Sequence, residues 1–139
     1  MKKILFGLLL LGSTLFAEVT DRPASIEFVN SGKMKIIDIR TEGEWVQMGV
    51  IKNSILLTFF DEQGRVDIDL FLEKLNKIIE KDEEFAIICN TGSRTKLVSN
   101  FLGKKLDYKV VNLMGGMMKL LKEGFKPEFY AGENTNIKK

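Results

Sequence analysis

The sequence predicts an α/β fold, in which one domain holds a mainly parallel sheet flanked by helices on both faces. Short apolar runs of strand length alternate along the chain with segments whose apolar residues recur at helical spacing. This alternation is typical of parallel strands joined by right-handed helical crossovers. The run Phe85–Ile88 is apolar at every position, as expected of a strand buried on both faces of such a sheet. No linker or internal repeat divides the 139 residues, so we expect one domain.

The first part of this domain is expected to contain a helix, a strand and a second helix. Apolar residues at helical spacing indicate a helix over residues 23–30, and residues 34–39 have the composition of a strand. Thr41 is followed three residues later by Glu44. This spacing is the pattern of a capping box, and it predicts that a short helix begins there.

The middle of the domain repeats the order of strand and helix. Residues 54–58 are expected to form a strand, and residues 67–80 place their apolar side chains on one helical face, with Asp67 as the N-cap. The buried strand Phe85–Ile88 follows, and a loop of small and polar residues leads from it into the next helix. Four apolar residues mark that helix: Leu97, Val98, Phe101 and Leu102.

The last part of the domain is expected to contain one strand and one helix. Residues 109–113 form the strand, and Gly124 ends the helix after it. The apolar residues of this last helix are Met117, Met118, Leu120 and Leu121.

Residues 1–17 have the pattern of a secretory signal peptide. A positively charged start precedes a short apolar run, which ends in small residues at Ala17. The run is shorter than the roughly 20 residues that a membrane-spanning helix needs, so cleavage is favoured over an uncleaved membrane anchor. We therefore expect residues 18–139 to form the mature domain. The protein should be periplasmic or otherwise exported, with no membrane association once the signal is cleaved.

The composition excludes several kinds of chemistry. The chain has no histidine, which excludes a Ser-His-Asp triad, a Cys-His pair and a His-ligated metal site. A single cysteine excludes an intramolecular disulfide and a Cys-x-x-Cys redox pair. Removal of residues 1–17 leaves 19 basic and 19 acidic residues. This balance indicates neither nucleic acid nor an anionic membrane as a partner.

Cys89 lies where the buried strand ends and the loop before the next helix begins. Ligands bind at the carboxyl ends of the strands in open parallel sheets, and a glycine-containing loop that enters a helix can turn several N–H groups toward one point. The helix dipole adds partial positive charge there. A thiol at that point should ionise readily and act as a nucleophile without histidine. The alternative is a structural cysteine that packs as a small apolar side chain.

Three segments of the chain resemble, in the right order, the signature segments of the rhodanese-like domains, a family of single-cysteine sulfurtransferases. Any one of the three alone would be a weak signal, because similar short patterns occur in many folds. The segments are Asp38-x-Arg40 followed by Glu44-Trp45, the cysteine loop over residues 89–95, and the Gly115-Gly116 pair before the last helix.

The resemblance implies a single-domain rhodanese-like fold and a mechanism that moves sulfur through Cys89. The thiolate would take the outer sulfur from a sulfane donor such as thiosulfate or polysulfide. The resulting persulfide would pass it to cyanide, a small thiol or a protein acceptor. No cofactor or metal is implied. The residues expected to bind substrate are Asn90, Thr91, Gly92, Ser93, Arg94 and Thr95, and those expected to support the site are Asp38 and Arg40.

One loop position departs from the family pattern. Many single-domain members carry arginine directly after the cysteine, whereas this chain has Asn90. The missing charge weakens the attraction for an anionic donor such as thiosulfate, and it leaves Arg94 and Lys96 as the nearby cations. Arg94 would either bind substrate or pair with an acid and brace the loop. Arg40 is expected to form an ion pair with Glu44.

Two other functional classes stay open. A resemblance of fold does not distinguish an active sulfurtransferase from a persulfide carrier or from a non-catalytic binding module. A cysteine-dependent phosphatase or arsenate reductase is disfavoured, because such enzymes hold an oxyanion in a longer loop, and only four residues separate Cys89 from Arg94 here.

Overall fold

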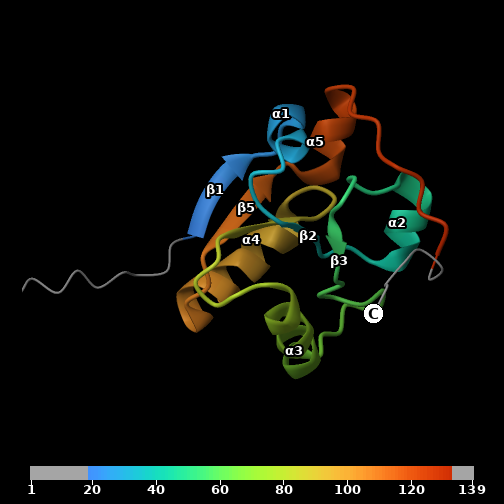
Figure 1. Cartoon of the computed structure of the whole chain (residues 1–139). Coiled ribbons are helices and arrows are strands. Elements are labelled where there is room, and N and C mark those ends of the chain that lie inside the picture. Colours follow the sequence, from blue (N-terminus) through green and yellow to red (C-terminus); the bar gives the residue numbers. More distant parts are fainter. Residues whose placement is uncertain (1–18, 133–139) are drawn as a thin grey trace, which may run out of the picture.

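The computed structural model describes residues 19–132. The expected signal peptide over residues 1–17 lies outside the described residues. The described chain forms a five-stranded parallel sheet in the order β1-β5-β4-β2-β3, with helices on both faces (Figure 1). The predicted α/β class is therefore confirmed. The strands are β1 (Val19–Pro23), β2 (Ile36–Asp38), β3 (Ile55–Leu56), β4 (Phe85–Ile88) and β5 (Val110–Met114).

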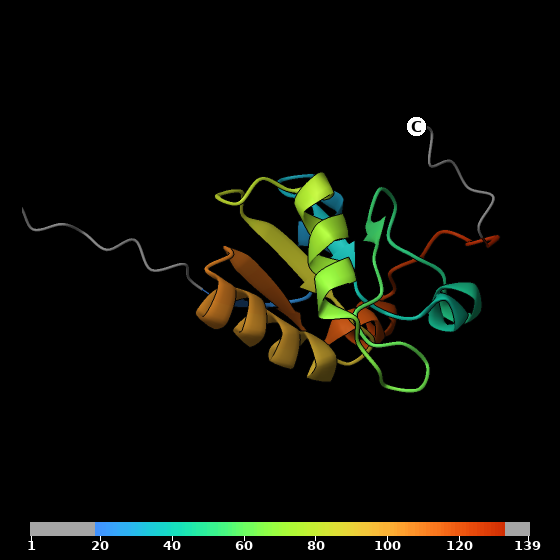
Figure 2. The same cartoon turned by 90° about the horizontal axis from the view of Figure 1, so that it is seen from below.

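The helices divide between the two faces of the sheet and one of its edges. Figure 1 shows α1 and α5 above the sheet and α3 and α4 below it, and Figure 2 shows α2 beside β3. No helix within residues 19–132 is both long enough and apolar enough to cross a bilayer. The helices are α1 (Ile26–Asn30), α2 (Glu42–Met48), α3 (Ile68–Ile78), α4 (Ser93–Asn100) with the π-helix Phe101–Lys105 directly after it, and α5 (Gly116–Lys122).

Strand β4 has apolar side chains on both faces of the sheet, so helices must cover both faces. Successive side chains of a strand point to opposite faces of the sheet. Phe85 and Ile87 therefore belong to the core beneath α3 and α4, whereas Ala86 and Ile88 belong to the core beneath α1 and α5. All four side chains are fully buried, as the continuous apolar run predicted.

The predicted starts of two helices are confirmed by their capping contacts. The Thr41 hydroxyl accepts the Glu44 backbone N–H, while a Glu44 carboxylate oxygen accepts the Thr41 backbone N–H at 3.1 Å. This is the complete capping box at the start of α2. The Asp67 carboxylate accepts the Leu70 N–H at 3.0 Å and caps α3.

The N-terminal strand was not predicted. Residues 19–23 pair in parallel with β5 at the edge of the sheet, and the first helix begins later than expected, at Ile26 after the N-cap Ser25. Four of the five residues of β1 are exposed. An edge strand with exposed side chains lacks the apolar pattern on which the prediction depended.

The predicted apolar face of the fourth helix is partly wrong. Leu97 is 65% exposed, whereas the neighbouring Val98 is buried together with Ser99. In the last helix Met117 is buried as expected, but Met118 is 39% exposed. Both exposed residues lie beside a buried one, because a helix that packs on a sheet buries only one stripe of side chains.

The ends of three adjacent strands bring the predicted site together. Asp38 ends β2, Met114 ends β5, and Cys89 directly follows β4, which lies between them in the sheet. Because all these strands are parallel, their carboxyl ends lie at the same edge, where ligands bind in open α/β sheets.

Candidate active site

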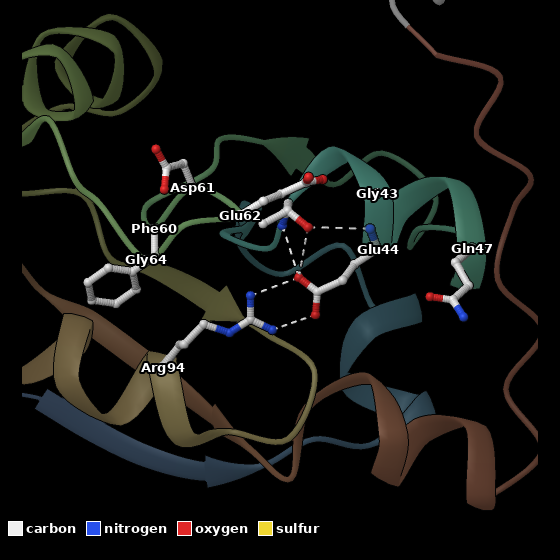
Figure 3. Close-up of a pocket in the computed structure, with 9 residues that line it drawn as sticks. Gly43, Glu44, Gln47, Phe60, Asp61, Glu62, Gly64 and Arg94 are labelled. Carbon is white, nitrogen blue, oxygen red and sulfur yellow. Dashed lines mark hydrogen bonds and ion pairs between the residues drawn. The ribbon is translucent and has the colours of Figure 1, made fainter.

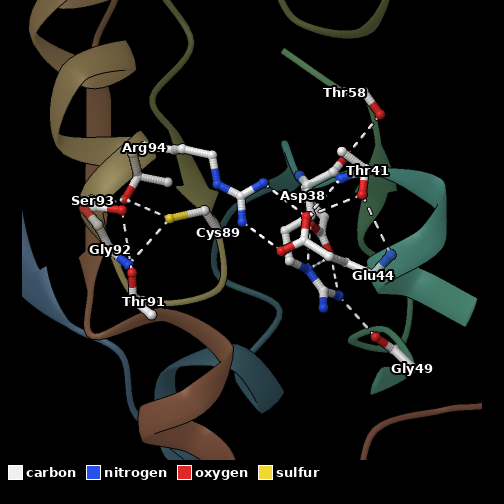
Figure 4. A network of polar contacts seen from close by, with 12 residues as sticks. Asp38, Thr41, Glu44, Gly49, Thr58, Cys89, Thr91, Gly92, Ser93 and Arg94 are labelled. Atoms are coloured by element: carbon white, nitrogen blue, oxygen red, sulfur yellow. Dashed lines mark hydrogen bonds and ion pairs between the residues drawn. The ribbon is translucent and has the colours of Figure 1, made fainter. Parts of the chain in front are cut away.

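The Cys89 sulfur lies inside the loop that joins β4 to α4. Its Sγ accepts the Gly92 backbone N–H at 3.1 Å and lies 3.6 Å from the Thr95 hydroxyl, to which the thiol can donate. The Thr95 hydroxyl in turn donates to the Gly92 carbonyl at 3.2 Å. Figure 4 shows the sulfur pointing toward the start of α4. The side chain is fully buried, so the loop covers the thiol from bulk solvent.

The start of α4 supplies the donors that this loop was expected to provide. Gly92 is the N-cap and has φ 93°, a left-handed conformation that glycine adopts without strain. The first N–H groups of a helix have no partner within it. Ser93 and Arg94 are the first two residues of this turn, and within residues 19–132 their N–H groups donate no hydrogen bond. Together with the helix dipole they can stabilise negative charge beside Cys89.

The Gly115-Gly116 pair brings the start of α5 against the backbone of the cysteine loop. The Met117 N–H donates to the Cys89 carbonyl and the Met118 N–H donates to the Asn90 carbonyl, both at 2.9 Å. Gly116 has φ 58°, and a β-carbon there would lie 2.4 Å from the Cys89 carbonyl oxygen. Only glycine allows so close an approach. The resemblance had placed this pair before the last helix, but its contact with the cysteine loop was not predicted.

Arg94 braces the loop through an ion pair with Glu44. Two guanidinium nitrogens donate to the two carboxylate oxygens at 2.8 and 2.6 Å. Arg94 lowers the pKa of Glu44 to about 2, mainly through its hydrogen bonds. The same bonds raise the pKa of Arg94, and the charges of Glu44 and Cys89 contribute to that increase. Arg94 was expected either to bind substrate or to pair with an acid and brace the loop, and the structure shows the pairing with an acid.

Glu44 was not among the predicted site residues. It joins α2 to α4 across 50 positions of the chain, and it is held in place by the Thr41 backbone and hydroxyl at 3.1 and 3.2 Å. The capping-box pattern indicated that its side chain is fixed, but it did not indicate which residue its second oxygen contacts.

The expected ion pair between Arg40 and Glu44 is wrong. Arg40 instead pairs with Asp38 at 2.7 Å, and both side chains are fully buried. Arg40 also donates to the Gly49 carbonyl at 2.8 Å, while the Thr58 hydroxyl donates to the Arg40 carbonyl at 2.7 Å. The alternation of the strand explains the difference, because residues two apart point to the same side and Arg40 reaches Asp38 first. Both residues therefore support the loops around the site from within the core.

The remaining loop residues lie at the surface around the sulfur. Thr91 and Ser93 are exposed, and their hydroxyls are 3.2 Å apart. Asn90 is partly buried, and its side-chain oxygen has no hydrogen-bond partner. Of the residues predicted to bind substrate, Gly92 and Thr95 contact the sulfur directly. Asp38 and Arg40, the predicted supporting residues, pair with each other in the core. No group of three or more acidic, Cys or His side chains that could hold a metal occurs between residues 19 and 132.

An open cleft of ≈ 620 Å³ lies next to this loop. Figure 3 shows it between the start of α2, the segment after β3 and the Arg94 side chain. Arg94 is its only basic lining residue among those described, while Glu44, Asp61 and Glu62 line it as acids. Cys89 does not line the cleft, and Arg94 is the residue that connects the two.

A family model described as the rhodanese-like domain matches residues 26–123. The chain is also 29% identical, over 86 residues, to a Bacillus subtilis protein named "Putative sulfurtransferase YtwF", a match that covers 62% of this chain and 72% of that protein. It is 28% identical over 110 residues to "Protein HIGH ARSENIC CONTENT 1, mitochondrial" of Arabidopsis thaliana, with 78% of this chain covered. That match spans 64% of the Arabidopsis protein's length.

Solved structures agree with the family model. A rhodanese-related protein from Thermoplasma volcanium superposes with a TM-score of 0.56 at 26% identity, covering 77% of this chain and 95% of its own. A rhodanese-like domain protein from Staphylococcus aureus superposes with a TM-score of 0.52 at 28% identity, covering 73% of this chain and 88% of its own.

Proposed function

We propose that this chain, which belongs to the rhodanese-like domain family, is an exported sulfurtransferase that carries a sulfane sulfur on Cys89. Membership of the family and similarity to a protein named as a sulfurtransferase support a role of this general type. The observation that supports the specific reaction is the sulfur of Cys89, hydrogen-bonded by Gly92 at the start of α4.

In the first half of the proposed reaction, Cys89 takes sulfur from a donor. The thiolate forms a bond to the outer sulfur of thiosulfate, the bond between the two donor sulfurs breaks, and sulfite leaves with the electron pair of that bond. The product is a persulfide anion on Cys89. The free N–H groups of Ser93 and Arg94 would stabilise its charge, as preorganised donors stabilise an oxyanion.

In the second half, an acceptor removes the outer sulfur. Cyanide forms a bond to that sulfur, the sulfur–sulfur bond breaks, and thiocyanate leaves while the Cys89 thiolate is restored. Neither half needs a general base once the thiol is ionised, which agrees with the absence of histidine from the chain.

The experiment that tests this proposal follows thiocyanate formation from thiosulfate or polysulfide with cyanide. We expect turnover by the wild-type chain and none by Cys89→Ser. Ser99→Ala, which removes a buried hydroxyl one turn further along α4 than Thr95, is the matched control and should turn over like the wild type. Folded wild-type protein that takes up no sulfur would contradict the proposal and favour a binding module. A single transfer without turnover would favour a persulfide carrier.

Export is a separate part of the proposal and depends on residues 1–17. Their pattern of positive start, apolar run and small residues supports cleavage after Ala17. The mass of the protein recovered from a periplasmic fraction tests it. A chain that begins at Glu18 is the expected result, and an intact Met1 in the cytoplasm would contradict it.

A further inference from the structure

Arg94 is a cation whose charge interacts with Cys89, but an ion pair with Glu44 already compensates that charge. Glu44 holds two of its nitrogens at 2.8 and 2.6 Å. The side chains of the pair are only 25% and 23% exposed. An ion pair of this bidentate geometry leaves little net charge for a third group.

Glu44 is an anion near neutral pH. Its carboxylate accepts the Thr41 backbone N–H and hydroxyl in addition to the Arg94 guanidinium. These contacts keep the pKa of Glu44 near 2. Near neutral pH the charge of Arg94 is therefore always compensated.

No other cation of the cleft takes the place of Arg94. Asp61 is paired with Arg65 at 2.8 Å, and Glu62 has no cationic partner among residues 19–132. Lys96, the other cation of this part of α4, does not line the cleft. The loop position after the cysteine is the neutral Asn90. The cleft beside the cysteine loop thus carries a slight excess of negative charge.

On the basis of the proposed function, we infer that Glu44 sets the charge of the sulfur donor. By neutralising Arg94 it favours sulfane donors with one negative charge or none, such as thiosulfonates and small organic persulfides, over the thiosulfate dianion. Glu44 acts through Arg94 and is a specificity-determining residue of the site. A dianion would meet the unpaired Glu62 and gain little from the compensated guanidinium.

Methanethiosulfonate is the matched probe for thiosulfate, because a methyl group replaces one charged oxygen and the outer sulfur is unchanged. The Cys89 thiolate forms a bond to that outer sulfur, and methanesulfinate leaves with the electron pair of the broken bond. We would measure the rate constants of sulfur loading for both donors. Their ratio reports donor charge and cancels changes in the reactivity of the thiol.

The variant that tests the inference is Glu44→Gln. Glutamine keeps the capping box and its hydrogen bond to Arg94 while it removes the charge. We expect the ratio of thiosulfate to methanethiosulfonate loading to rise about tenfold, the order expected for one unit charge near a protein surface. Glu73→Gln is the control, because it removes an acid from an exposed ion pair with Lys77, and it should leave the ratio unchanged.

A second measurement compares the salt dependence of sulfur loading in the wild type and in Glu44→Gln. Thiosulfate loading of the wild-type chain should change little with ionic strength, and in Glu44→Gln it should fall as salt screens the exposed Arg94. An unchanged donor ratio in Glu44→Gln, or a steep fall with salt in the wild type, would overturn the inference. Loading of the wild type by neither donor and by no polysulfide would overturn the proposed function and this inference together. Loading by both, with a ratio independent of Glu44, would overturn this inference alone.

Discussion

Gly116 lies directly against the backbone of Cys89, so that a β-carbon on Gly116 would be 2.4 Å from the Cys89 carbonyl oxygen. The same carbonyl accepts the Met117 N–H at 2.9 Å. The closing double glycine and the cysteine loop are therefore one packed unit. The position of the sulfur depends on residues that lie far from it in the sequence.

Gly116→Ala should disturb the site and the fold together. Alanine at φ 58° costs about 1–2 kcal/mol, and displacing the Cys89 carbonyl adds about 1–3 kcal/mol. We expect the free energy of unfolding, measured with urea, to fall by about 2–5 kcal/mol and sulfur loading to slow. Gly124→Ala is the matched control, because Gly124 has φ 91° but nothing within 4 Å. An equal loss of unfolding free energy in both variants would show that the contact between Gly116 and the Cys89 carbonyl does not determine the effect.

Thr95→Val should slow sulfur loading more than it lowers stability. Valine keeps the shape of the buried side chain but removes the hydroxyl that lies 3.6 Å from Sγ and donates to the Gly92 carbonyl. We expect a cost of about 1–2 kcal/mol in urea unfolding and loading slowed about tenfold, since the hydroxyl that accepts the thiol hydrogen, and that can rotate to donate to the ionised sulfur, is lost. Ser99→Ala removes another buried hydroxyl from the same helix. If it slowed loading equally, the role assigned to Thr95 would be wrong.

Glu44 should make stability depend on pH in the acid range. Its pKa is lowered from 4.5 to about 2 in the folded chain. The contribution is therefore complete above the unfolded value and is lost as pH falls from 4.5 toward 2. We expect about 1–2 kcal/mol after allowing for partial solvent screening. The gap in unfolding free energy between wild type and Glu44→Gln should shrink between pH 6 and pH 2.5, and a constant gap would contradict this.

Asp38→Asn should be among the most destabilising single changes. It leaves the fully buried guanidinium of Arg40 without its anion, at a cost of about 3–5 kcal/mol. Replacing both partners with apolar residues of similar size should recover most of this loss. Glu73→Gln in the exposed pair with Lys77 should cost less than about 1 kcal/mol. Similar losses in the buried and exposed pairs would show that burial does not determine the effect.

The sequence alone predicts the parts of this site that depend on local pattern. The continuous apolar run of β4, the capping box of Thr41 and the N-cap Asp67 are short-range features, and all are confirmed. The edge strand β1 was missed, because its residues are mostly exposed and its partner β5 lies more than 80 positions away. Its pairing comes from tertiary structure and not from local periodicity.

The charged residues of the site likewise show that local pattern was predictable and tertiary pairing was not. An acid partner for Arg94 was one of two expected roles, but the partner is Glu44, which the expected pair had assigned to Arg40. Each of these charged groups has several possible partners in the sequence. Only the tertiary fold, which brings Glu44 at the start of α2 within hydrogen-bond distance of Arg94 at the start of α4, selects among them.

The full burial of Cys89 was expected only under the alternative of a structural cysteine. The expectation of a reactive thiol implied an exposed one, which an oxidising compartment would threaten. The fully buried side chain instead limits access by large oxidants and by other thiols.

The central claim is that Cys89 carries a sulfane sulfur, and the mass of the intact protein after incubation with thiosulfate, methanethiosulfonate or polysulfide tests it most directly. The account predicts a gain of about 32 Da, the mass of one sulfur atom, from at least one donor. The gain should be lost on addition of cyanide and be absent from Cys89→Ser. A folded wild-type protein whose mass stays unchanged with every donor would contradict the account.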